Sequence, residues 1–169
     1  MSYIPHTRLI NVTKTRNKCI SASKSLNFTF KLTPVTSKVT YEGELRTVAT
    51  HLQSGTVIET DAPVDNQGKG ERFSPTDLVA TALASCMCTI MGIAARTHNL
   101  KIEGIVCEVE KIMAANPRRI GEIKVNIIFP KTAKLEEKYR TILERAALTC
   151  PVYESLHPDC KKSVLFIWP

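Results

Sequence analysis

The sequence predicts an α+β fold, because two kinds of periodicity occupy separate parts of the chain. Segments of alternating apolar and polar residues, typical of half-buried strands, lie within residues 38–60, 102–129 and 163–168. Two helical segments separate them, one uniformly apolar and one amphipathic. The order is strands, helix, two strands, helix, strand, which argues against a parallel doubly wound sheet. We therefore expect antiparallel sheets around a central buried helix.

Charge divides the chain into two regions. Most of the net charge of +7 comes from residues 1–32, which hold six basic residues and no acid, so that 17 of the 23 basic residues remain against 16 acidic ones. We expect residues 1–37 to be a poorly ordered basic extension and residues 38–169 to form the domain. The extension resembles an organelle-targeting peptide in composition, but a solvated tail or extra upstream sequence explains it as well. The nearly neutral domain predicts no nucleic-acid partner.

The first strands precede a loop. Residues 38–50, KVTYEGELRTVAT, alternate as a strand does at Val39, Tyr41 and Leu45, and SGTVIET supplies a turn and a second strand. These segments predict a hairpin or meander. The next segment, DAPVDNQGKGERF, collects turn-forming residues and predicts an exposed loop.

The apolar helix has a marked beginning. Ser74 is a candidate N-cap, Pro75 suits the first helical position, and Asp77 favours the positive end of the helix dipole. Residues 78–95 form an uncharged segment, and its length is about the minimum for a helix that spans a membrane. Because the run is mostly small residues between segments typical of soluble sheets, we expect a buried core helix and no membrane association.

The remaining elements follow the same patterns. Residues 102–114 and 119–129 predict an antiparallel pair, in which Cys107 is expected to pack in the core. Residues 132–150 predict an amphipathic helix that Pro151 ends, and SVLFIW predicts a final strand.

The chain has six cysteines but is long and shows no export signal. We therefore expect a functional cysteine to be reactive or a metal ligand, and not part of a structural disulfide. A reducing, cytoplasmic location is expected. Cys86 and Cys88 point roughly 200° apart on a helix, so they cannot serve one site from the same face. The stripe that carries Cys86 comprises Val79, Ala82, Cys86, Ile90 and Ile93. The stripe that ends at Cys150 comprises Tyr139, Leu143, Ala146 and Cys150.

Facing helices make Cys86 and Cys150 a candidate redox pair, since a nearby thiol can resolve a sulfenic acid. The alternative is that both are inert apolar residues of the core. Cys150, His157 and Cys160 match no common zinc spacing, and no metal is expected. The segment GKGERFSP lacks the spacing of nucleotide-binding loops, and no hydrolase nucleophile elbow surrounds Ser85.

Two motifs give the chain a family resemblance. SPTDLVATALASC and TCPVYESL resemble the two cysteine motifs of the OsmC/Ohr family of thiol peroxidases, and the resemblance covers about residues 38–169. It implies an OsmC-like fold, an interwoven homodimer with active sites at the subunit interface, and reduction of organic hydroperoxides or hydrogen peroxide. It implies that Cys86 is the peroxidatic cysteine and Cys150 the resolving one, whereas Cys88, Cys107 and Cys160 match no functional position. Because Cys88 points away from Cys150 by helical geometry, we expect it to stay reduced. An external dithiol, lipoyl groups in some members, is implied as the reductant, with no metal or flavin.

The chain departs from the family pattern at two charged positions. The glutamate expected after the helix-starting proline is Thr76 here, and Asp77 is the next acid. The thiolate-stabilising arginine is missing from TDAPVDNQGKG, and Arg72 and Arg46 are the nearest substitutes. Because a thiol in an apolar pocket needs a nearby cation to ionise at neutral pH, a second hypothesis stays open. It is a non-catalytic OsmC-like dimer that binds an apolar small molecule or senses oxidants.

Overall fold

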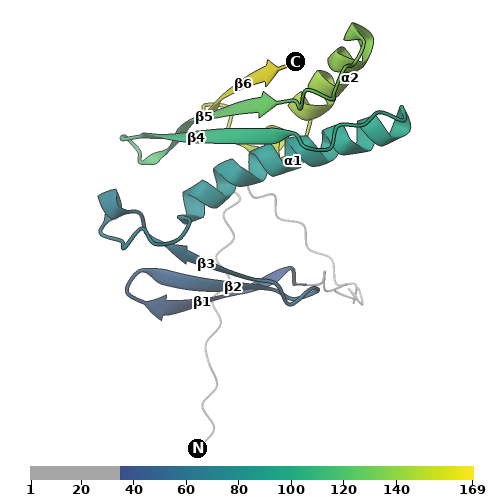
Figure 1. Cartoon of the computed structure of the whole chain (residues 1–169). Helices are drawn as coiled ribbons and strands as arrows, with labels where there is room; N and C mark the ends of the chain where they lie inside the picture. The colour runs from purple at the N-terminus through teal and green to yellow at the C-terminus, as the bar shows by residue number, and fades with distance from the viewer. Residues whose placement is uncertain (1–34) are drawn as a thin grey trace, which may run out of the picture. The chain divides into compact units, whose positions relative to one another are not determined.

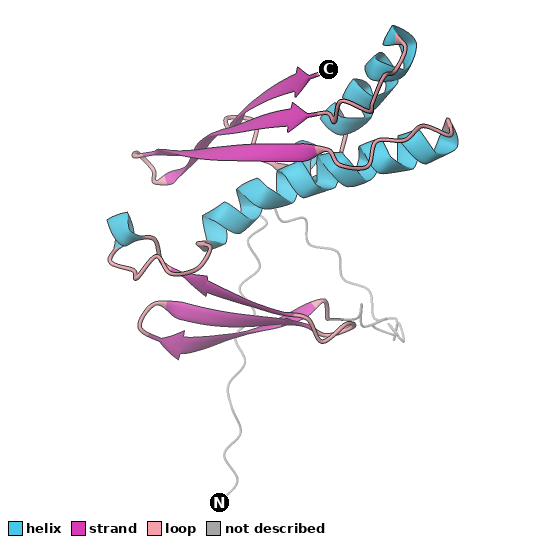
Figure 2. Cartoon of the chain, viewed as in Figure 1, coloured by secondary structure: helices cyan, strands magenta, loops and turns pink. Residues whose placement is uncertain are grey.

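The computed structural model describes residues 35–169, which form one compact unit, Val35–Pro169. Most of the predicted extension, residues 1–34, lies outside the described residues. The elements, shown in Figures 1 and 2, are β1 (Ser37–Gly43), β2 (Arg46–His51), β3 (Val57–Asp61), a 3-10 turn η1 (Val64–Asn66), α1 (Pro75–Thr97), β4 (Val106–Ala114), β5 (Arg119–Ile128), α2 (Glu137–Leu148), α3 (Pro151–Ser155) and β6 (Lys161–Ile167). The predicted α+β class is confirmed.

The first sheet is an antiparallel meander in the order β1-β2-β3. The sequence pattern treated residues 38–50 as one strand, and this is wrong because the chain reverses in the middle of the segment. Gly43, Glu44 and Leu45 all have positive φ, at 87°, 49° and 60°. Glycine adopts this left-handed backbone without strain, so EGEL forms the tight hairpin between β1 and β2.

The second sheet has the order β4-β5-β6 and is mixed. The antiparallel β4–β5 pair is confirmed, but β6 runs parallel to β5, which corrects the prediction of purely antiparallel sheets. A parallel neighbour needs a crossover connection, and α2 and α3 supply it between β5 and β6.

Helix α1 begins as the sequence predicts. Ser74 is the N-cap, and its Oγ accepts a hydrogen bond from the Asp77 backbone N at 3.1 Å. The Asp77 carboxylate in turn accepts from the Ser74 backbone N at 2.8 Å, which completes a capping box. The helix is long and apolar enough to cross a membrane by length and composition alone. It also packs against β4, β5, α2 and α3, as a helix inside a folded domain does.

The core lies between α1, α2 and the second sheet, and Figure 1 shows α1 running along that sheet beside α2. The largest fully buried apolar side chains are Leu83, Met87 and Met91 of α1, Ile123, Val125 and Ile127 of β5, and Leu143 of α2. This is not the stripe that the sequence predicted to be buried. Val79 and Ile93 of that stripe remain 40% and 58% exposed. Among residues 35–169, helix α1 is therefore covered on one side only.

The second cysteine motif lies at a helix junction. Helix α2 ends at Leu148, and Pro151 then occupies the first position of α3, with Cys150 as its N-cap. Proline both prevents continuation of α2 and starts the next helix, because its missing N–H costs nothing at that position. Cys150 is fully buried at the junction.

Candidate active site

Two pairs of thiols flank one buried residue of α1. Met87 is fully buried, and the half-buried Cys86 and Cys88 lie on either side of it, each about 100° around the helix. Cys86 neighbours Cys150, whereas Cys88 lies against Cys107 of β4. The described cysteines are all free thiols, so each pair is a dithiol.

The Cys86–Cys150 pair joins α1 to the α2–α3 junction. Burial raises the pKa of the Cys150 thiol above its ordinary value, the Tyr153 backbone N–H lowers it, and the adjacent Cys86 thiol raises it again. Tyr153 N donates to Cys150 Sγ at 3.4 Å. The raised pKa favours the protonated form of the Cys150 thiol. The structure thus brings together the two cysteines that the sequence analysis paired.

The Cys88–Cys107 pair was missed by the sequence analysis, which expected Cys107 only to fill the core. The two Sγ atoms are 3.2 Å apart. The hydrogen bond between them lowers the pKa of Cys88 to about 7, while the same bond and burial raise the pKa of Cys107 above its ordinary value. The available signal was the alternation of Ile105, Cys107 and Val109, which directs all three toward the apolar helix.

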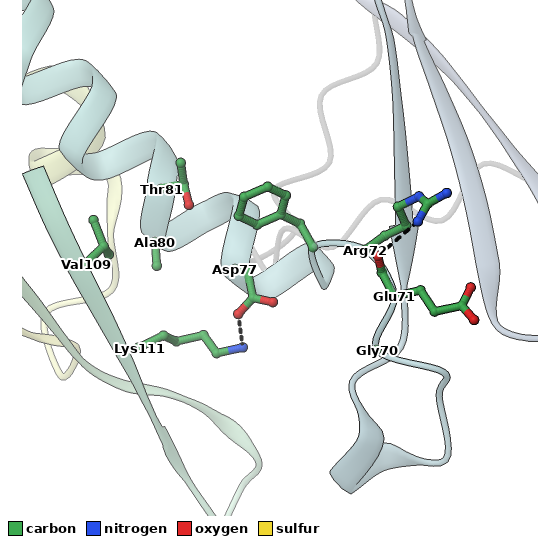
Figure 3. A pocket seen from close by; sticks show the side chains of 9 residues that line it. Gly70, Glu71, Arg72, Asp77, Ala80, Thr81, Val109 and Lys111 are labelled. Atoms are coloured by element: carbon green, nitrogen blue, oxygen red, sulfur yellow. Dashed lines mark hydrogen bonds and ion pairs between the residues drawn. The ribbon is translucent and has the colours of Figure 1, made fainter.

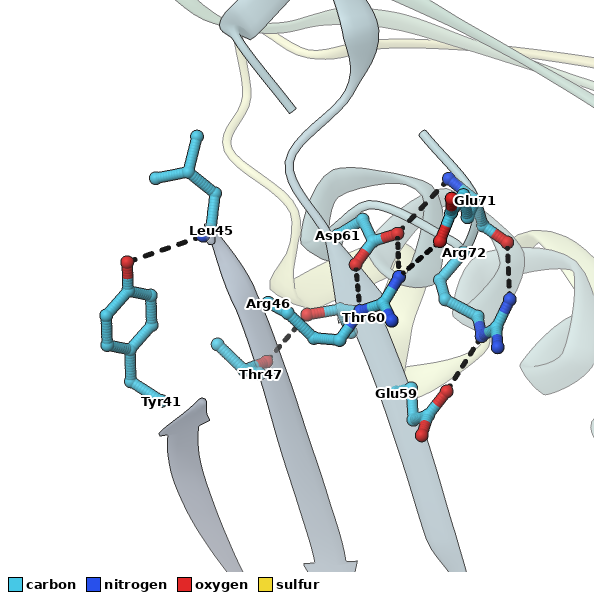
Figure 4. A network of polar contacts seen from close by, with 9 residues as sticks. All are labelled: Tyr41, Leu45, Arg46, Thr47, Glu59, Thr60, Asp61, Glu71 and Arg72. Carbon is cyan, nitrogen blue, oxygen red and sulfur yellow. Dashed lines mark hydrogen bonds and ion pairs between the residues drawn. The ribbon is translucent and has the colours of Figure 1, made fainter. Parts of the chain in front are cut away.

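The two predicted arginines belong to a polar network around β2 and β3, shown in Figure 4. Arg46 binds Asp61 through two bonds, Nε–Oδ1 at 2.7 Å and Nη2–Oδ2 at 2.8 Å, and also binds Glu71 at 2.8 Å. Asp61 is 2% exposed, and the bond from Arg46 holds the pKa of its carboxyl below the ordinary value. Arg72 Nε pairs with Glu59 at 2.7 Å on the surface. These bonds anchor the loop of residues 62–73 to the first sheet.

Neither arginine reaches Cys86 in the same chain. Cys86 lies 11 residues after Pro75, which places it roughly 16 Å along the helix axis from the first turn. Among residues 35–169, no hydrogen bond or ion pair joins Arg46 or Arg72 to that thiol. The idea that Arg72 folds back over the helix start to Cys86 is therefore corrected. A role for either arginine stays a prediction that requires a second copy of the chain.

Asp77 instead forms an ion pair with Lys111 of β4, with Nζ 2.6 Å from Oδ1. Lys111 also donates to Thr76 Oγ1 at 2.8 Å and Ser74 Oγ at 3.2 Å. Burial acts to raise the pKa of Asp77, but the hydrogen bonds from Lys111 and Ser74 outweigh burial and lower it. The pair lines a cavity of about 510 Å³ together with Arg72 (Figure 3). The structure thus places Asp77 at the helix start and away from the thiols.

Comparison with known proteins identifies the family. The family model described as OsmC-like protein matches residues 68–164. This chain belongs to the OsmC-like protein family. Both cysteines of the Cys86–Cys150 pair lie inside the matched range. Among curated proteins, no relative matches this OsmC-like chain.

Solved structures agree with the assignment. A Psychrobacter arcticus 273-4 protein, whose name refers to osmotic stress induction and a detoxification response, is 55% identical, with a TM-score of 0.77 over 81% of this chain and 98% of that one. An organic hydroperoxide resistance protein OsmC from Legionella pneumophila is 15% identical, with a TM-score of 0.61 over 79% and 98%. An OsmC-like protein from Vibrio cholerae is 13% identical, with a TM-score of 0.64 over 79% and 100%. The two distant structures show that the fold is shared.

Proposed function

We propose that this OsmC-like protein is a cysteine-dependent thiol peroxidase that reduces organic hydroperoxides or hydrogen peroxide. The observation that carries the proposal is the adjacency of Cys86 and Cys150, from two motifs 64 residues apart, in a chain of this family. The Legionella pneumophila relative is named for organic hydroperoxide resistance and as a redox protein, which supports the same chemistry.

The reaction uses the two thiols in sequence. The Cys86 thiolate attacks one oxygen of the hydroperoxide, the O–O bond breaks, and the alcohol leaves with a proton. Cys86 is then a sulfenic acid. The Cys150 sulfur attacks the Cys86 sulfur, the disulfide forms, and water leaves with the proton of the Cys150 thiol. The substrate gains two electrons and the two cysteines lose them.

The proposed cycle needs an external dithiol and a second subunit. A dithiol such as a lipoyl group reduces the Cys86–Cys150 disulfide by exchange and becomes a cyclic disulfide itself. The homodimer covers the exposed side of α1 and brings a cation toward Cys86. A cytoplasmic, reducing location suits a protein whose five described cysteines are free. No metal or flavin takes part in these steps.

A turnover assay tests the proposal. Purified protein is mixed with cumene hydroperoxide and dihydrolipoamide in a Cys88→Ser background, because Cys88 has a thiol partner of its own. Cys86→Ser should reduce consumption of the hydroperoxide to the uncatalysed rate, and Cys150→Ser should prevent recycling after one turnover. Cys160→Ser is the matched control, since Cys160 is buried near the start of β6 and should leave turnover unchanged. Turnover that survives Cys86→Ser contradicts the proposal.

A second function is favoured by one observation, which is that no bond among residues 35–169 joins a cation to Cys86. A dimer that only binds an apolar molecule needs no ionised thiol, whereas a dimer that senses oxidants through Cys86 would need one. The thiolate absorbance of Cys86 separates a peroxidase from a binding dimer, when it is taken as the difference between Cys88→Ser protein and the same protein with Cys86→Ser added. A pKa of Cys86 at or above the ordinary thiol value of about 8.5 favours the binding dimer. A pKa near neutral pH favours the peroxidase.

A further inference from the structure

A second dithiol lies on the opposite side of α1 from the proposed active site. The Sγ atoms of Cys88 and Cys107 are 3.2 Å apart, so a movement of about 1.2 Å brings them to the 2.05 Å of a disulfide bond. The two residues belong to elements that pack together, α1 and β4, and Cys107 is held in register opposite Ile127 of β5. The packing of α1 on β4 therefore holds the two sulfur atoms close together.

The Cys88–Cys107 pair differs from inert core cysteines in its exposure. Both thiols are half-buried, and Cys88 lines a cavity of about 730 Å³ together with Gly92 and Ile105. The cavity gives a small oxidant access to Cys88, and the Cys107 sulfur is 3.2 Å from the Cys88 sulfur. The S–H···S hydrogen bond favours one thiolate in the pair, which is the nucleophilic form of cysteine.

We propose that Cys88 and Cys107 form a second redox-active dithiol, which an organic hydroperoxide oxidises to a disulfide that joins α1 to β4. Cys88 attacks an oxygen of the hydroperoxide, the O–O bond breaks, and the alcohol leaves with a proton. The Cys107 sulfur then attacks the resulting Cys88 sulfenic acid, the S–S bond forms, and water leaves with the Cys107 proton. This proposal differs from the expectation that Cys88 stays reduced.

This dithiol reacts independently of Cys86 and Cys150. Cys86 and Cys88 point roughly 200° apart, so neither sulfur of one pair can reach the other pair directly. The Cys88–Cys107 disulfide would fix the middle of α1 to the sheet. The helix that carries the proposed peroxidatic cysteine would thereby gain a covalent link to β4.

The test uses a variant that lacks both cysteines of the proposed active site. The full chain with Cys86→Ser and Cys150→Ser is treated with excess cumene hydroperoxide, free thiols are alkylated, and tryptic peptides are mapped. The expected product joins peptide 73–96, which then contains only Cys88, to peptide 102–111, which contains only Cys107. Two thiols per chain should be lost. Adding Cys160→Ser to this background is the matched control and should leave the product unchanged.

Two further results decide the proposal. Cys107→Ser in the same background should leave a Cys88 sulfenic acid that dimedone traps, whereas the chain with Cys107 intact should show little trapping. Complete alkylation of both Cys88 and Cys107 after treatment, in protein with native circular dichroism, would overturn the proposal. Because Cys86 and Cys150 are absent from these variants, the outcome is independent of whether the proposed peroxidase cycle operates.

Discussion

At the scale of single residues, Lys111 connects the start of α1 to the second sheet. Its ammonium group contacts the Asp77 carboxylate and the hydroxyls of Ser74 and Thr76. Ser74 is 1% exposed, so its hydroxyl depends on these partners in place of water. The charge at Asp77 thus contributes to fold stability, in addition to its favourable position at the helix N-terminus.

Asp77→Asn should lower the free energy of unfolding by about 1 kcal/mol at pH 7, through loss of the ion pair with Lys111 and of the negative charge at the helix N-terminus. Since the folded protein lowers the pKa of Asp77, this contribution is complete above the ordinary carboxyl pKa and is lost as pH falls through the lowered value. Urea unfolding of both proteins at pH 7 and pH 3 should show the difference shrinking at pH 3.

Asp65→Asn is the control for this change, because Asp65 forms an exposed pair with Arg118 and should alter stability little at either pH. A difference between Asp77→Asn and the native protein that grows as pH falls would contradict the assignment.

A second residue-scale prediction concerns Arg72, whose side chain is 47% exposed. In assembled protein carrying Cys88→Ser, Arg72→Ala should slow iodoacetamide alkylation of Cys86 at pH 7, because a lost cation reduces the thiolate fraction. Arg118→Ala removes a similarly exposed arginine and should leave the rate unchanged. An unaltered rate in Arg72→Ala would exclude Arg72 from thiolate stabilisation.

At the scale of elements, local signals in the sequence predicted helices better than strand connections. The α1 cap could be predicted because Ser74, Pro75 and Asp77 act within one turn. The hairpin inside 38–50 was missed because its apolar residues alternate on both sides of the turn at Glu44. The parallel β5–β6 pair depends on how a crossover packs, which periodicity does not encode.

The candidate site could likewise be predicted from helix geometry, but not where it depends on contacts between a helix and a strand. Helical geometry separated Cys86 from Cys88, and the apolar stripe of the second helix led to Cys150. Cys107 could not be placed opposite Cys88, because that contact depends on the register of β4 along α1. The positions of Arg46 and Arg72 relative to Cys86 likewise depend on tertiary packing, which the sequence pattern does not reveal.

The buried side of α1 gives an element-scale prediction. Met87→Ala should lower the free energy of unfolding by about 2–5 kcal/mol, because the side chain is fully buried and leaves a cavity between the two thiol pairs. Chemical denaturation monitored by circular dichroism measures the change. Thr97→Ala, at the exposed end of α1, is the control and should cost much less. Equal losses in both variants would contradict the packing described for Met87.

At the scale of the whole molecule, the part of the chain that the structure describes leaves large apolar side chains exposed. One side of α1 exposes Val79 and Ile93, and β1 exposes Val39 and Tyr41 at 62% and 65%. A three-stranded sheet this exposed gains little stability alone, and contiguous apolar patches mark interaction surfaces. A second copy of the chain covers these surfaces in the homodimer that we propose.

Light scattering should therefore report about twice the 18.8 kDa of one chain. Ile93→Asp should shift the protein toward the mass of one chain, because it places an unpaired charge on the uncovered side of α1. Leu165→Asp is the control, since Leu165 is similarly exposed, at 56% against 58%, but lies on β6. A native protein that is monomeric at micromolar concentration would contradict the dimer.

The central claim is that oxidation joins Cys86 to Cys150, and peptide mapping tests it most directly. Tryptic peptide 73–96 contains both Cys86 and Cys88, and peptide 146–161 contains both Cys150 and Cys160, so the full chain should carry Cys88→Ser and Cys160→Ser. One equivalent of cumene hydroperoxide should then join these two peptides, and further Cys86→Ser should abolish hydroperoxide consumption. Peptides that remain unlinked, or consumption that persists without Cys86, would contradict the account.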